Sequence, residues 1–325
     1  MEFPVEISKS FAIVVVPYLL LLTFKNKSPH MPPSKNGFNW LALAPFVFVG
    51  LWATGFIGSR LSAPYAEPLS FLSIRFAIVT VILLLASLFF RARWPDPKTC
   101  GWAMLTGVFL HGGYLGGVFW SIYYGMPAGV AALITALQPL LTSVLAGTIL
   151  GEKISLRHWI GLLVGLVGVG MVVWPKLTFA AEGITPATLA VCFMATLSIT
   201  IGSIMQKRFV ANVDLRSGNA LQFAGGGIAV LVVALATERF DITWNGDVIF
   251  AMIWLVLVLS IGAITLLYLM IRHGEVSKVA SLFFLVPSVA AVIAFFMFDE
   301  TLVPIQLLGM AVCAGAVLLV TRKVA

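Results

Sequence analysis

Charged side chains are scarce in this sequence. They make up 10% of its 325 residues, whereas hydrophobic residues make up 60%. A soluble domain carries about 25% charged residues, because most of its surface faces water. The scarcity excludes an ordinary soluble protein and predicts an integral membrane protein.

Cysteine and clustered basic charge are also lacking. The three cysteines, Cys100, Cys192 and Cys313, have no paired spacing, so neither a disulfide framework nor a metal site is expected. The net charge is +7, but the lysines and arginines stand singly or in twos between apolar runs. Such charges orient membrane segments rather than bind phosphates, so nucleic acid is not an expected partner.

Long apolar runs are what the sequence does contain. Runs of this length and continuity are typical of membrane-spanning helices rather than of alternating barrel strands. The sequence therefore predicts an all-α integral membrane protein with ten transmembrane helices. The expected spans are 41–59, 69–90, 101–121, 128–150, 155–174, 187–207, 217–237, 248–270, 277–298 and 303–321.

Residues 1–38 differ from the rest and are interpreted as an N-terminal extension. Their apolar run from Phe11 to Phe24 is interrupted by Pro17 and falls short of the roughly 20 residues that cross a bilayer. Two interpretations stay open. Translation starts at Met31 and the extension is not native, or the extension forms an interfacial helix.

The basic residues predict the orientation of the helices. If the first helix starts in the cytoplasm, twelve basic residues fall on the inner side and three on the outer side. Cytoplasmic loops carry the excess of lysine and arginine, so both termini are expected to be cytoplasmic. The inner residues are Arg91, Arg93, Lys98, Lys153, Arg157, Lys207, Arg208, Arg216, Arg272, Lys278, Arg322 and Lys323, and the outer ones are Arg60, Lys176 and Arg239.

An internal repeat organises the chain. The stretch from Met126 to Pro175 returns near the C-terminus at a constant offset of 148 positions, which pairs Pro139 with Pro287 and Glu152 with Glu300. We expect two repeats of five helices, residues 39–175 and 186–322. Because five is odd, the second repeat enters the membrane from the opposite side, and such inverted repeats are typical of transporters that work by alternating access.

Several motifs resemble those of one known family. The segment GEKISLRHWIGLLVGLVGVGMVV, the preceding SIYYGMPAGVAALITALQP and a tryptophan in the first helix followed by SIRF in the second are similar to the EamA family of the drug/metabolite transporter superfamily. The resemblance covers residues 41–322. It implies a ten-helix carrier in a bacterial cytoplasmic membrane, commonly an exporter of amino acids or related metabolites.

No acidic residue lies in the middle of an expected span, which weakens a carboxylate relay for protons or sodium. His111 does lie at mid-span, where it is interpreted either as a solute partner or proton carrier, or as a neutral histidine bonded to a neighbouring helix. Tyr114 is expected to share its helical face. Trp52 in the first span, Gln138 in the fourth and Gln222 in the seventh complete a candidate solute site with His111.

Arg75 lies within the second span and has two interpretations. Its guanidinium is suited to capturing a carboxylate, which would place it in the solute site. Alternatively, Arg75 extends to the outer interface or pairs with Glu67.

The paired residues of the repeat have expected roles of their own. A proline inside a helix removes a hydrogen bond, so Pro139 and Pro287 are candidates for helix breaks that line the cavity or act in gating. Glu152 and Glu300 are expected to be structural, each capping the helix that follows it.

The leading hypothesis is a secondary carrier of a small metabolite, with amino-acid export as the first expectation. Uptake or exchange of another solute is the alternative within this class, and a non-transporting scaffold or embedded enzyme is the alternative outside it. No HExxH, DxD or GxSxG motif stands near His111, so no enzyme, catalytic residue or cofactor is expected. The expected partners are the solute and the bilayer, with the protein a monomer or a homodimer.

Overall fold

The computed structural model describes residues 43–176, 183–298 and 301–322, so the extension 1–38 and Glu300 lie outside the described residues. Within this part of the chain the secondary structure is helical. The α-helices are α2 (Ala44–Ser62), α3 (Pro68–Phe89), α4 (Pro97–Gly107), α5 (Tyr114–Tyr123), α6 (Ala128–Thr135), α7 (Gln138–Ile149), α8 (Leu156–Val173), α9 (Pro186–Met205), α10 (Leu215–Thr237), α11 (Gly246–Trp254), α12 (Ile264–His273), α13 (Val276–Ser281), α14 (Val286–Phe298) and α15 (Pro304–Thr321). Three π-helical segments, η2 (Val108–Gly113), η4 (Gln206–Val210) and η5 (Leu255–Ala263), and two 3-10 segments, η3 (Trp174–Lys176) and η6 (Leu282–Leu285), join or extend them.

Eight helical stretches in the described residues are long and apolar enough to cross a bilayer. They are Pro68–Phe89, Ala128–Ile149, Leu156–Val173, Pro186–Val210, Leu215–Thr237, Gly246–His273, Val276–Met297 and Pro304–Thr321. Helix α2 lies at the first expected position, and its apolar part is the shorter stretch Ala44–Gly55. The continuous run of α4, η2 and α5 lies at the third expected position. The chain is therefore a multi-pass membrane protein.

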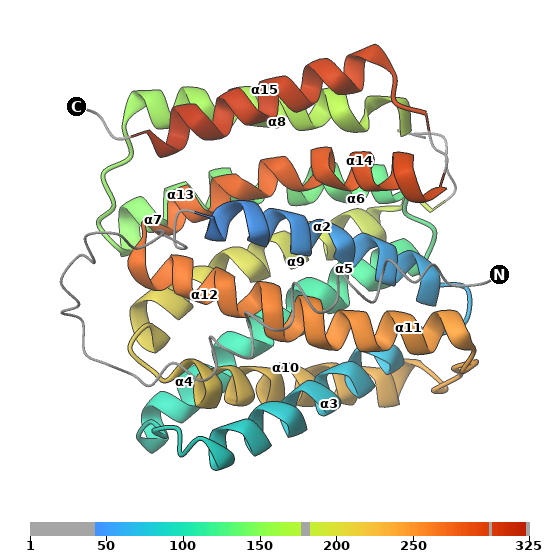
Figure 1. Ribbon diagram of the computed structural model, residues 1–325, viewed down its shortest axis with the longest axis vertical. Helices are drawn as coiled ribbons and strands as arrows, with labels where there is room; N and C mark the ends of the chain where they lie inside the picture. Colours follow the sequence, from blue (N-terminus) through green and yellow to red (C-terminus); the bar gives the residue numbers. More distant parts are fainter. Residues whose placement is uncertain (1–42, 177–182, 299–300, 323–325) are drawn as a thin grey trace.

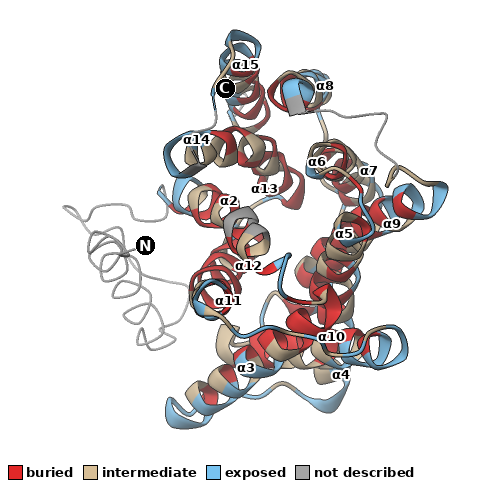
Figure 2. Ribbon diagram, turned by 90° about the vertical axis from the view of Figure 1, so that its right-hand side faces the viewer, coloured by how far each residue is buried: buried red, intermediate tan, exposed pale blue. Residues whose placement is uncertain are grey.

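The helices run alongside one another (Figure 1), and an end-on view shows how they are grouped (Figure 2). Helices α8 and α15 pack on each other at one edge of the bundle, while α3, α4 and α10 pack together at the opposite edge. Between these edges, α5 and α7 contact α9, and α2 contacts α11, η5 and α14. The third helical run, α4 to α5, thus lies against both α9 and α10.

The outward surface of the bundle is apolar. Large hydrophobic side chains such as Phe89, Leu163, Val232 and Leu235 are more than half exposed. A monomeric protein in water rarely exposes so much contiguous apolar area, whereas lipid solvates it. Since polar side chains such as Thr106, Thr196 and Gln222 are buried instead, the bundle has the side-chain distribution of a protein surrounded by lipid.

Helix breaks interrupt two of the spans at the repeated prolines. Helix α6 ends at Thr135 and α7 starts at Gln138, so Pro139 lies in the first turn of α7. In the matching span, η6 separates α13 from α14, and Pro287 lies in the first turn of α14. Proline is well placed in a first turn, where its missing N–H has no helical partner to lose.

Glu152 does not cap the helix that follows it, contrary to our expectation. Ser155 caps α8 by accepting from the backbone N–H of His158. The Glu152 carboxylate instead accepts from the backbone N–H groups of Val276, at 2.6 Å, and Ser277, at 3.1 Å. It therefore caps α13, which lies 124 residues away in the sequence, and it ties the first half of the chain to the second.

A second carboxylate makes a similar contact in the other direction. Glu238, which follows α10, accepts from the backbone N–H groups of Leu69 and Ser70 at the start of α3. Both caps place negative charge at the positive end of a helix dipole. Each half of the chain thus supplies a carboxylate that caps a helix of the other half.

We predict that Glu152→Gln destabilises the protein by about 1–3 kcal/mol, because charge-assisted hydrogen bonds at a helix N-terminus are lost. The thermal unfolding midpoint of the detergent-purified protein would fall. Glu275→Gln is the matched control, since Glu275 is exposed and pairs with Lys278 alone among the described residues. Equal midpoints for the two variants would contradict a capping role for Glu152.

Candidate functional site

The third helical run approaches α10 unusually closely, and glycines on both sides permit this. A Cβ atom added to Gly107 would lie 1.9 Å from the backbone oxygen of Gln222, and one added to Gly225 would lie 2.2 Å from that of Met104. Only residues without a side chain allow two helix backbones to pack at such a distance. The contact brings the start of η2 against the middle of α10.

His111 lies in η2 and is fully buried beside this contact. Its Nε2 is 3.1 Å from the Tyr268 hydroxyl of α12, and its ring stacks on Phe223 of α10 at 4.0 Å between centroids. Its Nδ1 has no partner among the described residues. The histidine is therefore bonded to a neighbouring helix on one side and keeps one ring nitrogen available on the other.

Arg75 of α3 is also buried, with 1% of its surface exposed. Its Nε donates to the Ser260 hydroxyl of η5 at 3.0 Å, while its Nη1 has no partner among the described residues. The structure shows neither of the two alternative contacts that the sequence had left open for Arg75. It does not extend to the interface, and Glu67 instead accepts from the backbone N–H groups of Arg239 and Asp241.

Arg75 and His111 belong to one cluster. Phe76, the next residue after Arg75, lies with its ring 5.9 Å from the His111 ring and 5.6 Å from the Phe223 ring. The Arg75 guanidinium carbon lies 5.9 Å from the centroid of the same Phe76 ring, so Arg75 and His111 both contact this phenylalanine. Gln222 is buried on α10 next to Phe223, and its Oε1 has no partner in this part of the chain.

Trp52 and Tyr114 form a separate pair. The Tyr114 hydroxyl lies near the Trp52 indole, and the Trp52 ring meets the Phe283 ring edge-on with 5.1 Å between their centroids. Both side chains are buried but retain 8–9% exposure. Tyr114 is thus not a partner of the His111–Tyr268 pair, although it follows His111 by three residues.

Gln138 lies apart from both groups, at the start of α7. Its Nε2 donates to the Thr142 hydroxyl at 3.3 Å, and its Oε1 has no partner among the described residues. Together with Ser203, Leu267 and Phe283 it lines a space that is too narrow to admit a water molecule. The structure therefore brings Arg75 and His111 together, places Gln222 beside Tyr268 and Trp52 with Tyr114, and leaves Gln138 in a neighbouring space.

Three residues of this cluster were not among the expected site residues. Tyr268, Ser260 and Phe223 contact His111 or Arg75 directly. Tyr268 and Ser260 are polar side chains inside an expected span, and that is the one signal in the sequence that could have identified them. No group of three or more metal-ligating side chains occurs in the described residues.

We predict that Gly107→Ala prevents normal packing of α4 on α10, because the added methyl group would overlap the Gln222 backbone. The expected loss is about 3 kcal/mol or more, at the upper end for overpacked interiors. It would be measured as a lower yield of monodisperse protein and a lower unfolding midpoint. Gly101→Ala on the same helix, which meets no atom within 4 Å, should behave like the unchanged protein.

The chain matches one family model twice. Residues 39–174 and residues 187–322 each match the EamA-like transporter family. The two matches together cover most of the chain, so the expected family is confirmed.

Curated relatives match most of the chain as well. The uncharacterized transporter YvbV of Bacillus subtilis is 26% identical over 87% of this chain and 92% of its own length. The uncharacterized inner membrane transporter YedA of Escherichia coli is 26% identical over 86% of this chain and 89% of its own length. The probable amino-acid metabolite efflux pump of Salmonella typhimurium is 25% identical over 85% of this chain and 91% of its own length. These relatives are transporters, which confirms that the chain is not an enzyme.

A solved crystal structure shares the fold. It superposes with a TM-score of 0.72 over 88% of this chain and 97% of the other chain, at 19% sequence identity.

Proposed function

Since the chain belongs to the EamA-like transporter family, we propose that this membrane transporter is a secondary carrier that exports amino acids or related small metabolites by alternating access. Its family and relatives are transporters, so a scaffold or embedded enzyme is not supported. The observation that carries the proposal for the solute is the buried cluster of Arg75 and His111.

The proposed architecture has ten spanning helices in two inverted five-helix repeats, residues 39–175 and 186–322. The double family match supports two repeats, and helical segments occur at all ten expected positions. The excess of basic residues on one side supports cytoplasmic termini in a bacterial inner membrane. The partners are a small solute and the bilayer, with the carrier acting as a monomer or a homodimer.

Arg75 supports a solute that bears a carboxylate. An arginine remains charged at neutral pH, and a buried charge is costly unless an opposite charge or several hydrogen bonds compensate it. Arg75 makes no ion pair with any described residue and has an unused Nη1 donor. A bound carboxylate would supply the missing negative charge, and the planar guanidinium matches its geometry.

His111 supports recognition of the rest of the solute. Tyr268 fixes its ring by a hydrogen bond and Phe223 by stacking, so the unused Nδ1 is held in one direction. A preorganised polar group of this kind binds a ligand without first having to become ordered. Gln222, Trp52, Tyr114 and Gln138 are proposed as the further solute contacts of the pathway.

The helix breaks at Pro139 and Pro287 support movement within the bundle. A break leaves the two parts of a span able to tilt independently, and matched breaks in the two halves suit a carrier that opens alternately to each side. We assign gating to these two residues.

Amino acids are the first solute class to test. The Salmonella relative is named a probable amino-acid metabolite efflux pump, and an amino acid carries a carboxylate that could pair with Arg75. Uptake or exchange of another carboxylate-bearing solute is the second candidate, because the Arg75 cluster would serve either direction. Exchange of sugar phosphates would call for paired lysine or arginine residues at mid-span, and the sequence places no such pair in the middle of an expected span.

The test is transport in proteoliposomes with a panel of labelled amino acids and other metabolites, with and without a pH gradient. Accumulation of at least one carboxylate-bearing solute above empty liposomes is the expected result. Transport of only neutral or cationic solutes would overturn the proposed class of solute but would still support a carrier function. Absence of transport for the whole panel would count against amino-acid export itself.

We predict that His111→Ala lowers transport at least about tenfold, since a lost hydrogen bond in a buried site costs roughly 1.5–3 kcal/mol. The protein should still insert and purify as the unchanged protein does. His273→Ala is the matched control, because His273 is exposed at the end of α12. Unchanged rates in His111→Ala would remove His111 from the solute site and leave it a packing residue.

We predict that Arg75→Gln abolishes the carrier's preference for a carboxylate-bearing solute over the corresponding amide. The reason is that the guanidinium is the group that binds the negative charge. For each variant, inhibition of labelled-solute transport by the unlabelled acid would be compared with inhibition by the corresponding amide. Arg75→Lys should keep part of the preference, since the charge remains but the planar fork does not. Arg208→Gln, at an exposed position, should leave it unchanged. A preserved preference in Arg75→Gln would place carboxylate recognition elsewhere.

A further inference from the structure

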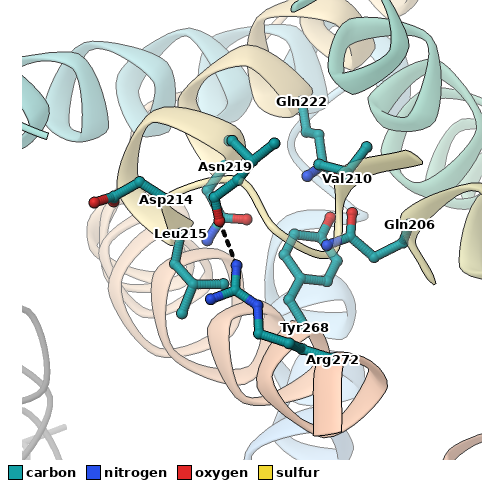
Figure 3. Close-up of a pocket in the computed structure, with 10 residues that line it drawn as sticks. Gln206, Val210, Asp214, Leu215, Asn219, Gln222, Tyr268 and Arg272 are labelled. Carbon is teal, nitrogen blue, oxygen red and sulfur yellow. Dashed lines mark hydrogen bonds between the residues drawn. The ribbon is translucent and has the colours of Figure 1, made fainter. Parts of the chain in front are cut away.

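A second polar region lies between the His111–Tyr268 pair and the end of the bundle. We call it the inner polar pocket and define it by Gln206, Asp214, Asn219, Gln222, Tyr268 and Arg272. Figure 3 shows the side chains of Gln206, Asn219 and Arg272 converging beside Tyr268. The space between them is too narrow to admit a water molecule.

Unpaired polar atoms are concentrated around this space. Of the nine buried side-chain atoms without a partner in the described part of the chain, four line it: Gln206 Oε1, Asn219 Oδ1, Gln222 Oε1 and Arg272 Nε. A buried polar atom without a hydrogen bond costs free energy, and native proteins rarely keep several together. These atoms come from three different elements, η4, α10 and α12, so one local distortion does not account for them.

The inner polar pocket is continuous with the proposed solute site. Tyr268 lines the pocket with its ring and bonds His111 with its hydroxyl. Gln222 lines the pocket and lies next to Phe223, on which His111 stacks. Tyr268 therefore belongs both to the pocket and to the proposed solute site.

Two basic residues, Arg272, which lines the pocket, and Lys207, which follows Gln206 in η4, make contacts at this end of the bundle. Arg272 donates to the backbone oxygen of Val213, in the connection between η4 and α10. Lys207 donates to the backbone oxygens of Ile271, Arg272 and Gly274, at 2.8, 3.0 and 2.9 Å. These contacts hold the ends of η4 and α12 together. All are made to backbone oxygens, which water can take over when the two ends separate.

From these observations we infer that the inner polar pocket is a passage that opens to water in another conformation of the carrier. Through it, a small solute with hydrogen-bonding groups moves between the His111–Tyr268 pair and the side of the membrane that holds the η4–α10 and α12–α13 connections. The unpaired amide groups and Arg272 are then satisfied by water or by the passing solute. The inference rests on the proposed carrier function, but its test does not require the solute to be known.

The test is the reactivity of single cysteines in the full-length protein with a charged, membrane-impermeant thiosulfonate reagent. The background carries Cys100→Ala, Cys192→Ala and Cys313→Ala, and its folding is checked by size-exclusion chromatography and by its unfolding midpoint. Cysteines are then introduced one at a time, and the reagent is added to sealed vesicles from either side.

Asn219→Cys reports on the inner polar pocket, and Ala220→Cys is its matched control. Ala220 is the next residue of α10, is fully buried and does not line the pocket. We expect Asn219→Cys to react at least about tenfold faster than Ala220→Cys, because the rate follows the population of the open state. The faster reaction should occur from the same side as that of Glu275→Cys, which is exposed next to the α12–α13 connection.

Gln206→Cys provides a second reporter on a different helix, in case Asn219→Cys does not fold. It should also react from the side that labels Glu275→Cys. The inference is overturned if Glu275→Cys reacts but the folded pocket variants are as unreactive as Ala220→Cys from both sides. It is also overturned if they react only from the opposite side. Either result would leave the carrier assay unaffected, so the two failures can be told apart.

Discussion

The close contact between α4 and α10 is the constraint on which the candidate site depends. Gly107 and Gly225 let the two backbones meet, and this contact sets His111 against Phe223 and within reach of Tyr268. Lipid offers little hydrophobic drive for helices to associate, so close packing of small residues and polar contacts between helices hold such a bundle together. The same glycines therefore permit the packing of the bundle and set the positions of the candidate site residues.

Much of the fold could be predicted from the sequence, because the bilayer imposes a minimum length on every apolar run. The expected spans 69–90, 217–237 and 303–321 end within two residues of α3, α10 and α15. The buried positions of His111 and Gln222 also followed from the cost of placing such residues in lipid, whereas the position of Arg75 had been left open between the solute site and the outer interface. A polar residue inside an apolar run was a sufficient signal for these two.

The partners of these residues could not be predicted in the same way. Hydropathy says that Tyr268 and Ser260 are inside a span but not which side of the helix they occupy, and the π-helical segments η2 and η5 shift that side without changing composition. Glu152 was expected to act locally, because caps are usually local, whereas its partners lie 124 and 125 residues further on. Such contacts depend on how helices are arranged, which a single sequence does not encode in any short pattern.

The reciprocal caps have a consequence for how the chain becomes a folded unit. Glu152 completes α13 and Glu238 completes α3, so neither half of the chain contains all the groups that its own helices need. A half synthesised alone would leave a helix N-terminus without its carboxylate. The two caps therefore stabilise the association of the two halves as well as the helices that they complete.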